Sequence, residues 1–188
     1  SADINNTYYN ATVIYNSSGE ILRVIKYDSA YVRQITTDES DNIFIGGNVW
    51  RQEFSNQYDF FLNKYDSSGN WLWNKTYNTP FSQQRNDYFS WMSLDVQNEN
   101  IYYTGSTIFF NQDGYSFTLF KYSSDGDSVW KRGYSPVTNS SNPPVHLTRD
   151  KYNNFYVTGS SNFNTPYYRF LTVKYDSAGN FIWAENYL

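Results

Sequence analysis

Large apolar residues alternate with polar ones in short runs along the whole sequence, and clusters of Gly, Asn, Asp and Ser separate the runs. Alternation with a period of two is typical of a β-strand that has one buried face. The runs 60–65 and 71–77, which read FFLNKY and WLWNKTY, flank the turn sequence DSSGN. This arrangement predicts a β-hairpin, and the same pattern elsewhere predicts an all-β chain.

The hairpin pattern occurs four times along the chain. Its turn glycines are Gly19, Gly69, Gly126 and Gly179, which lie 50, 57 and 53 residues apart. In the last three copies, two further alternating runs precede the hairpin. Each full unit therefore predicts a four-stranded antiparallel meander of about 50 residues.

Tandem meanders of this length are typical of β-propeller blades. The sequence predicts one domain over residues 1–188, with a half blade at 8–30 and full blades at 31–78, 88–135 and 145–188. A β-sandwich is the alternative, although a sandwich does not require the same turn at the same place in every unit.

The residues around the repeated turn resemble a known family. The third full unit reads FYVTG at 155–159 and VKYDSAGNFIW at 173–183, and related sequences recur in the other units. This pattern resembles the SBBP-type beta-propeller repeats of bacterial and archaeal secreted and cell-surface proteins. The resemblance covers nearly all of the chain after residue 8. It implies a propeller fold and an extracellular setting, and it implies no catalytic residues.

The recurring turn is predicted to be scaffold. Asp66 is expected to accept hydrogen bonds from backbone N–H groups two or three residues on, and Gly69 is expected to adopt a positive φ. Trp73, Trp130 and Trp183 each follow a turn glycine by four residues, so each is expected to pack against a neighbouring blade. The carboxylates lack the spacing of an EF-hand loop, and we expect no metal site and no cofactor.

Composition narrows the class of protein further. Aromatic residues make up 21% of the chain, including 20 Tyr, which favours β-structure. The net charge of −4 comes without a basic cluster and argues against a nucleic-acid partner. The chain has no cysteine, no apolar run long enough to span a bilayer and no basic-then-apolar signal peptide, so we expect a soluble, processed, secreted chain without membrane insertion.

The variable connections are expected to form the binding face. An up-and-down meander places the segments 48–59, 107–115, 161–169, 78–88 and 135–146 at the end of the sheets opposite the tight turns. Their aromatic and guanidinium side chains suit protein interfaces and sugar rings. The candidate binding residues are Trp50, Arg51, Tyr58, Phe109, Phe110, Tyr115, Phe163, Tyr167 and Tyr168.

Catalysis has little support in the sequence. The chain contains a single histidine, His146, and has neither a nucleophile elbow nor a phosphate-binding glycine loop. Asp59, Asp87 and Asp113 lie on the candidate face, but their spacing gives no preferred pair for glycoside hydrolysis. Five sequons permit glycosylation in a secreted setting, at Asn5, Asn10, Asn16, Asn74 and Asn139.

The strand count suggests self-assembly. Residues 8–27 match only the last two strands of a unit. Either a four-part ring forms with a two-stranded blade, or the chain is part of a longer propeller, or strands come from a neighbouring molecule, and in the last two cases an unfilled edge recruits other strands. An extended arm at residues 1–9 that pairs with the next molecule would generate a filament. We therefore expect first a non-enzymatic extracellular protein that assembles with itself, second an adhesin-type binder of glycans or surface proteins, and third a glycoside hydrolase.

Overall fold

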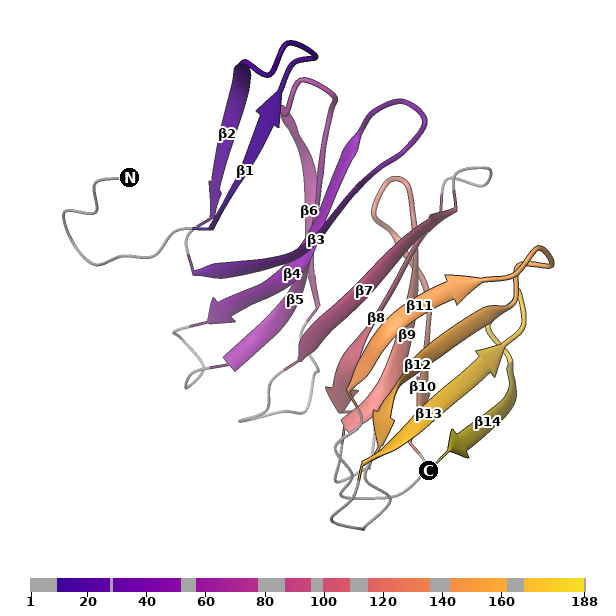
Figure 1. Cartoon of the computed structure of the whole chain (residues 1–188). Coiled ribbons are helices and arrows are strands. Elements are labelled where there is room, and N and C mark those ends of the chain that lie inside the picture. Colours follow the sequence, from indigo (N-terminus) through magenta and orange to yellow (C-terminus); the bar gives the residue numbers. More distant parts are fainter. Residues whose placement is uncertain are drawn as a thin grey trace.

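The computed structural model describes residues 10–27, 29–51, 57–77, 87–95, 100–108, 115–135, 143–161 and 168–187. These ranges contain fourteen β-strands and no helix. The strands form four antiparallel sheets, none of which closes on itself (Figure 1). The prediction of an all-β chain is confirmed.

The sheets follow one another along the chain. The hairpin sheet contains β1 (Asn10–Tyr15) and β2 (Ile21–Tyr27). The second sheet contains β3 (Ala30–Thr37), β4 (Ile43–Arg51), β5 (Gln57–Tyr65) and β6 (Trp71–Tyr77). The third contains β7 (Tyr88–Asp95), β8 (Asn100–Ile108), β9 (Tyr115–Ser123) and β10 (Ser128–Tyr134). The fourth contains β11 (Pro144–Arg149), β12 (Phe155–Ser161), β13 (Arg169–Tyr175) and β14 (Phe181–Tyr187).

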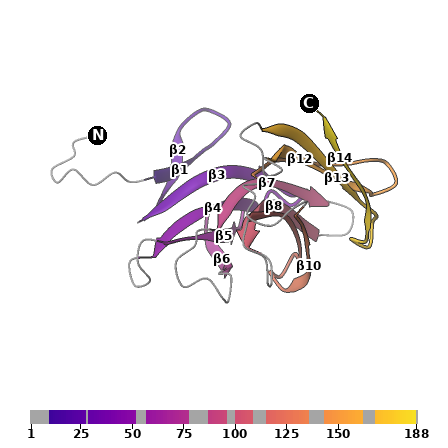
Figure 2. The ribbon, with the colours of Figure 1, turned by 90° about the horizontal axis from the view of Figure 1, so that it is seen from below.

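The four sheets form a row with the hairpin sheet at one end and the fourth sheet at the other, as Figures 1 and 2 show from two directions. The first strands of the larger sheets approach one another, since β7 packs beside both β3 and β11. The tight turns β1–β2, β5–β6, β9–β10 and β13–β14 all lie on one side of the row (Figure 1). The opposite strand ends are therefore the place where the predicted binding face belongs.

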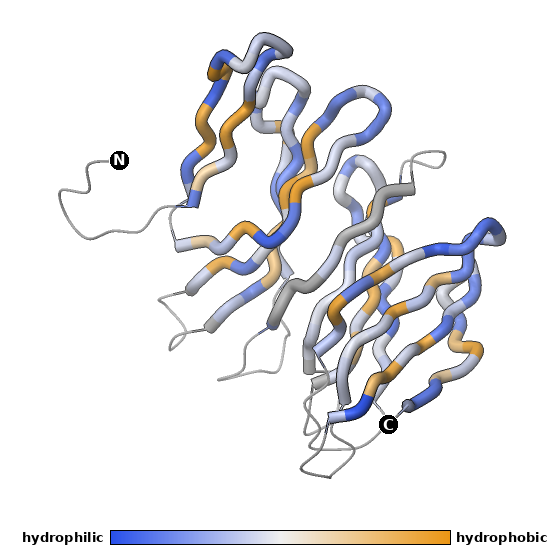
Figure 3. Tube along the Cα trace, viewed as in Figure 1, coloured by the Kyte–Doolittle hydropathy of each residue, from blue (hydrophilic) through white to orange (hydrophobic). Residues whose placement is uncertain are grey.

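The core consists of three apolar layers between neighbouring sheets. Residues alternate between layers along each strand: Phe61 packs toward the hairpin sheet, whereas Phe60 and Leu62 pack toward the third sheet. Phe60 meets Phe120 of the third sheet edge to face, with ring centroids 5.6 Å apart. Figure 3 shows the same alternation of hydrophobic and hydrophilic positions along the strands. The period-two pattern thus gives the second and third sheets two apolar faces, one toward each neighbouring sheet.

The four hairpin turns share one geometry. The Oδ1 of Asp66 accepts hydrogen bonds from the backbone N–H groups of Ser68 at 2.9 Å and Asn70 at 2.8 Å. The backbone N–H of Gly69 donates to the carbonyl oxygen of Asp66 at 2.9 Å, so the expected hydrogen bonds from two and three residues on are confirmed, with a further donor four residues on. Gly69 has φ +78°, and the other three turn glycines have φ of +81° or +82°, so the predicted positive φ is confirmed.

Each turn glycine of a larger sheet rests on the last strand of the sheet before it. A Cβ added to Gly179 would lie 3.0 Å from the Trp130 ring, and one added to Gly126 would lie 3.1 Å from the Trp73 ring. A Cβ added to Gly69 would lie 2.6 Å from Ile14 and 2.8 Å from Arg23, and Arg23 occupies the Trp position of the hairpin sheet. The glycine therefore serves twice, because it permits the positive φ and leaves room for the neighbouring side chain. The expected packing of Trp73 and Trp130 on neighbouring sheets is confirmed.

We predict that three turns with an Asp–Asn hydrogen bond make stability depend on pH: the β5–β6 turn at Asp66, the β11–β12 turn at Asp150 and the β13–β14 turn at Asp176. The side-chain hydrogen bond from Asn154 lowers the pKa of Asp150 to about 2, and the equivalent Asn70 and Asn180 lower the pKa values of Asp66 and Asp176. A lowered folded-state pKa stabilises the fold above the ordinary value of 3.8, and this stabilisation is lost as the pH falls from there toward 2.

Urea unfolding at pH 6, 4 and 2.5 measures this dependence. The Asp150→Asn variant keeps the amide-oxygen acceptor but cannot titrate, so its loss of stability between pH 4 and 2.5 should be smaller than that of the wild type. Equal losses in the two proteins would contradict the assignment.

We also predict that Trp130→Ala destabilises the fold strongly. Trp130 contacts Tyr102, Phe155 and the turn at Gly179. Removal of a half-buried indole should cost roughly 2 to 4 kcal/mol in the free energy of unfolding. The matched control is Trp71→Ala, because Trp71 is 62% exposed. Its substitution should cost about 0.5 kcal/mol or less in the same urea titration, and similar losses at both positions would refute the packing role.

Candidate functional site

A hollow of about 290 Å³ opens where β1 and β3 begin, β4 ends and β5 begins. This is the side of the row opposite the tight turns (Figure 1). The hollow lies at the lower end of the size range of small-ligand pockets, roughly 300 to 1,000 Å³. Its lining residues are Asn10, Ser29, Ala30, Tyr31, Trp50 and Tyr58. We call this hollow the aromatic pocket.

Strand pairing builds the walls of the aromatic pocket. Trp50 and Tyr58 are cross-strand partners on β4 and β5, and their rings meet edge to face with centroids 4.8 Å apart. Tyr31 on β3 meets Tyr58 at 5.8 Å and is 49% exposed. The backbone N–H of Trp50 donates to the carbonyl of Ser29 at 2.7 Å, and this bond ties the end of β4 to the start of β3. Three aromatic side chains therefore meet at a braced strand end.

A second hollow of about 170 Å³ adjoins the aromatic pocket and shares Tyr31 and Tyr58 with it. Arg33 and Asn48 complete its lining. Asn48 is 2% exposed, and its Nδ2 donates to the carbonyl of Asp87 at 2.8 Å. Its Oδ1 is buried and has no hydrogen-bond partner within the described part of the chain. A buried acceptor left without a donor costs about 1 to 3 kcal/mol, and this oxygen belongs to a residue that lines the second hollow.

Buried charge lies behind the site, between the second and third sheets. Asp87 is 2% exposed, and its backbone N–H donates to the carbonyl of Tyr58 at 2.7 Å. Burial lowers the pKa of Lys131, while the negative charge of Asp87 acts in the opposite direction. Lys131 donates through Nζ to the hydroxyl of Tyr77. The wall behind the two hollows is thus held by polar contacts between the sheets.

Two of the predicted binding residues, Trp50 and Tyr58, come together in the aromatic pocket. Tyr168 is 62% exposed and immediately precedes β13 in the sequence, so it belongs to the fourth sheet and not to the aromatic pocket. Only the backbone is described at Arg51 and Tyr115. The remaining candidates, Phe109, Phe110, Phe163 and Tyr167, lie outside the described residues.

Sequence reasoning missed three residues of the site. Tyr31 and Arg33 lie inside the predicted strand β3, and Asn48 follows the glycine pair of β4. The signal that finds them is register, because Tyr31 pairs directly with Asn48. The sequence alone does not show which residues of neighbouring strands lie opposite one another, so these three residues could be found only from the strand pairing.

The sequons differ in how their side chains are used. Asn10 lines the aromatic pocket and donates through Nδ2 to the carbonyl of Ala30 at 2.8 Å. Asn16 occupies the first position of the β1–β2 turn and donates to Glu20. Asn74 is exposed on β6. Asn5 and Asn139 lie outside the described residues, and glycosylation at all five positions stays a prediction.

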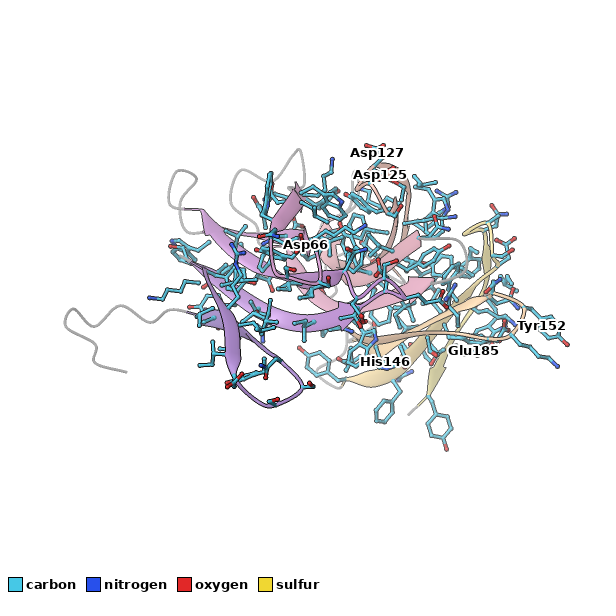
Figure 4. All side chains as sticks on the ribbon, turned by 90° about the horizontal axis from the view of Figure 1, so that it is seen from above. Asp66, Asp125, Asp127, His146, Tyr152 and Glu185 are labelled. Carbon is cyan, nitrogen blue, oxygen red and sulfur yellow. The ribbon has the colours of Figure 1, made fainter. Side chains whose placement is uncertain are left out.

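Of the groups considered for catalysis, Asp59 and Asp87 are both buried, and the backbone N–H of Asp87 donates to the carbonyl of Tyr58, the residue before Asp59. The ring of His146 packs against Trp91, with centroids 4.3 Å apart. Figure 4 shows His146 well separated from the turn carboxylates Asp66, Asp125 and Asp127. Asp59 is 1% exposed, and Asp113 lies outside the described residues. Across the described ranges, no group of three or more His, Cys, Asp or Glu side chains is placed to hold a metal ion, and no helix has the length and apolar character to cross a membrane.

No protein-family model matches the chain, and the curated proteins likewise yield no match. The resemblance to SBBP-type repeats therefore stays a prediction.

Proposed function

We propose that this chain is a non-enzymatic, extracellular protein of the β-propeller type that binds a neutral carbohydrate in the aromatic pocket. The observation that carries the proposal is the convergence of Tyr31, Trp50 and Tyr58 beside the buried, unpartnered Oδ1 of Asn48. Of the roles expected from the sequence, ligand binding is the one that these residues favour.

The propeller architecture is supported by the order and packing of the sheets. The three larger sheets are four-stranded meanders, and their first strands lie near one another, as inner strands do around a propeller axis. The extracellular setting is supported by the resemblance of the turn and strand motif to SBBP-type repeats.

The chemistry of the pocket matches a sugar ring. Aromatic faces pack against the C–H face of a pyranose, and Tyr31 and Trp50 offer such faces at the rim. A sugar hydroxyl donates and accepts at once, so it can satisfy the Asn48 Oδ1 and accept from the Arg33 guanidinium. The buried carboxylate of Asp87 behind the wall and the net charge of −4 favour a neutral ligand over an anionic one.

A screen on an array of neutral oligosaccharides, followed by calorimetry on the strongest binder, tests the proposal. We expect Trp50→Ala and Tyr31→Ala each to weaken binding at least about tenfold, which corresponds to about 1.4 kcal/mol. Asn48→Leu should weaken binding as well, because it removes the buried acceptor.

The control is Tyr168→Ala, which removes an exposed aromatic side chain from a different sheet and should leave binding unchanged. Circular dichroism verifies that each variant keeps the β-fold. Absence of binding to any neutral glycan at millimolar concentration would refute the proposal, as would unchanged binding by both Trp50→Ala and Tyr31→Ala.

A further inference from the structure

The last three strands of each larger sheet carry the same row of three side chains, one from each strand. Each row contains an aromatic residue, a lysine and a tryptophan that are direct neighbours in the strand register, and the lysine lies over the aromatic ring. The rows are Phe44–Lys64–Trp73, Tyr102–Lys121–Trp130 and Tyr156–Lys174–Trp183. The three rows are therefore equivalent surfaces.

The first two rows are covered by the turn of the following sheet. Lys64 Nζ and Trp73 Nε1 both donate to the carbonyl of Ser124, at 3.2 and 3.1 Å. Gly126 lies on the Trp73 ring and Gly179 lies on the Trp130 ring. The row that contains Trp183 therefore offers an equivalent surface on which a glycine turn can pack.

The fourth sheet leaves this surface open. Phe60 is 1% exposed and stacks with Tyr77, because the third sheet covers both. The register places Phe170 and Tyr187 as the corresponding cross-strand pair of the fourth sheet, and they are 71% and 76% exposed. Two large aromatic side chains beside Trp183 therefore face solvent.

The hairpin sheet carries the complementary surface, also open. Nothing lies within 4 Å of a Cβ added to Gly19, whereas the other three turn glycines are in contact with a neighbouring sheet. The tyrosine four residues before the turn glycine is 6% exposed at Tyr65 and 2% exposed at Tyr175, but it is 56% exposed at Tyr15. Val24 on the same hairpin is 45% exposed. The outward face of the hairpin therefore resembles the faces that pack on Trp73 and Trp130 inside the chain.

We propose that the open face of the fourth sheet binds the hairpin sheet of a second copy of this chain. In this junction Gly19 rests on the Trp183 ring, and Lys174 Nζ and Trp183 Nε1 donate to the carbonyl of Ser17. These contacts are inferred by analogy with the junction between the second and third sheets, where Gly126 lies on the Trp73 ring and Lys64 and Trp73 donate to Ser124. The two surfaces lie at opposite ends of the row in Figures 1 and 2, so they meet between copies.

The junction is heterologous, because each copy contributes a different surface. Such contacts repeat head to tail and give a ring where the rotation between copies closes, or an open series of particles where it does not. The aromatic pocket contributes to neither surface, so the assembly stands independently of the proposed carbohydrate binding. The partner is thus the same chain, joined through sheet faces instead of through an N-terminal arm.

Sedimentation velocity of the whole chain over a concentration series tests the junction. We expect the wild type to form dimers and then longer species as the concentration rises. Trp183→Ala and Val24→Glu should each remain monomeric, because each removes one of the two surfaces at an exposed or half-exposed position. Trp71→Ala is the matched control and should assemble like the wild type.

An equimolar mixture of the two blocked variants gives the sharpest result. Trp183→Ala keeps an intact hairpin face and Val24→Glu keeps an intact fourth-sheet face, so the mixture should form one-to-one dimers and stop there. A wild type that stays monomeric at every concentration would overturn the proposal. So would assembly that persists in Trp183→Ala, or a mixture that fails to form dimers. Trp50→Ala should assemble normally whether or not it binds a glycan, which separates this test from the test of the pocket.

Discussion

The contact between a turn glycine and the tryptophan of the preceding sheet is the constraint on which the rest of the structure depends. The glycine must adopt a positive φ to make the turn and must lack a Cβ to accept the ring. These two requirements coincide at Gly126 and Gly179, where backbone conformation and packing select the same residue. At Gly69 the neighbour is Arg23, whose Nη1 also donates to Asn70 at 2.8 Å, so an ionic side chain replaces the indole at the first junction.

This contact sets what the remaining elements can do. The β5–β6, β9–β10 and β13–β14 turns pack on the preceding sheet, and the opposite strand ends carry the aromatic pocket. The polar contacts around Asp87 and Lys131 then hold the second and third sheets together behind that pocket. The same contact, left unfilled at Trp183 and Gly19, supplies the two surfaces of the proposed assembly. Scaffold and interaction surface are therefore built from one recurring motif.

Much of the fold could be predicted from the sequence, because its signals are local. Alternation of apolar and polar residues marks the strands, and the turn motif at Asp66 and Gly69 marks the hairpins. The pocket was only half predicted. Trp50 and Tyr58 are large aromatic residues of the predicted connection 48–59 and draw attention. Asn48 begins the same segment without a distinctive side chain, and Tyr31 lies in a different strand and reaches the site through its pairing with Asn48. The self-assembly expected through residues 1–9 concerns a segment outside the described residues, and the sheet faces that replace it become recognisable only when exposure is compared between equivalent positions.

Proton NMR of the glycine α-protons shows whether the turn glycines rest on the indole rings of neighbouring sheets. A proton held against an indole face experiences the ring current, which shifts its resonance upfield. The account predicts upfield α-proton resonances for Gly126 and Gly179, whose added Cβ positions lie within 3.2 Å of Trp73 and Trp130, and an ordinary resonance for Gly69 beside Arg23. Substitution of Trp130 by leucine should return Gly179 alone to the ordinary range. Four turn glycines with indistinguishable α-proton resonances, unchanged by that substitution, would contradict the account.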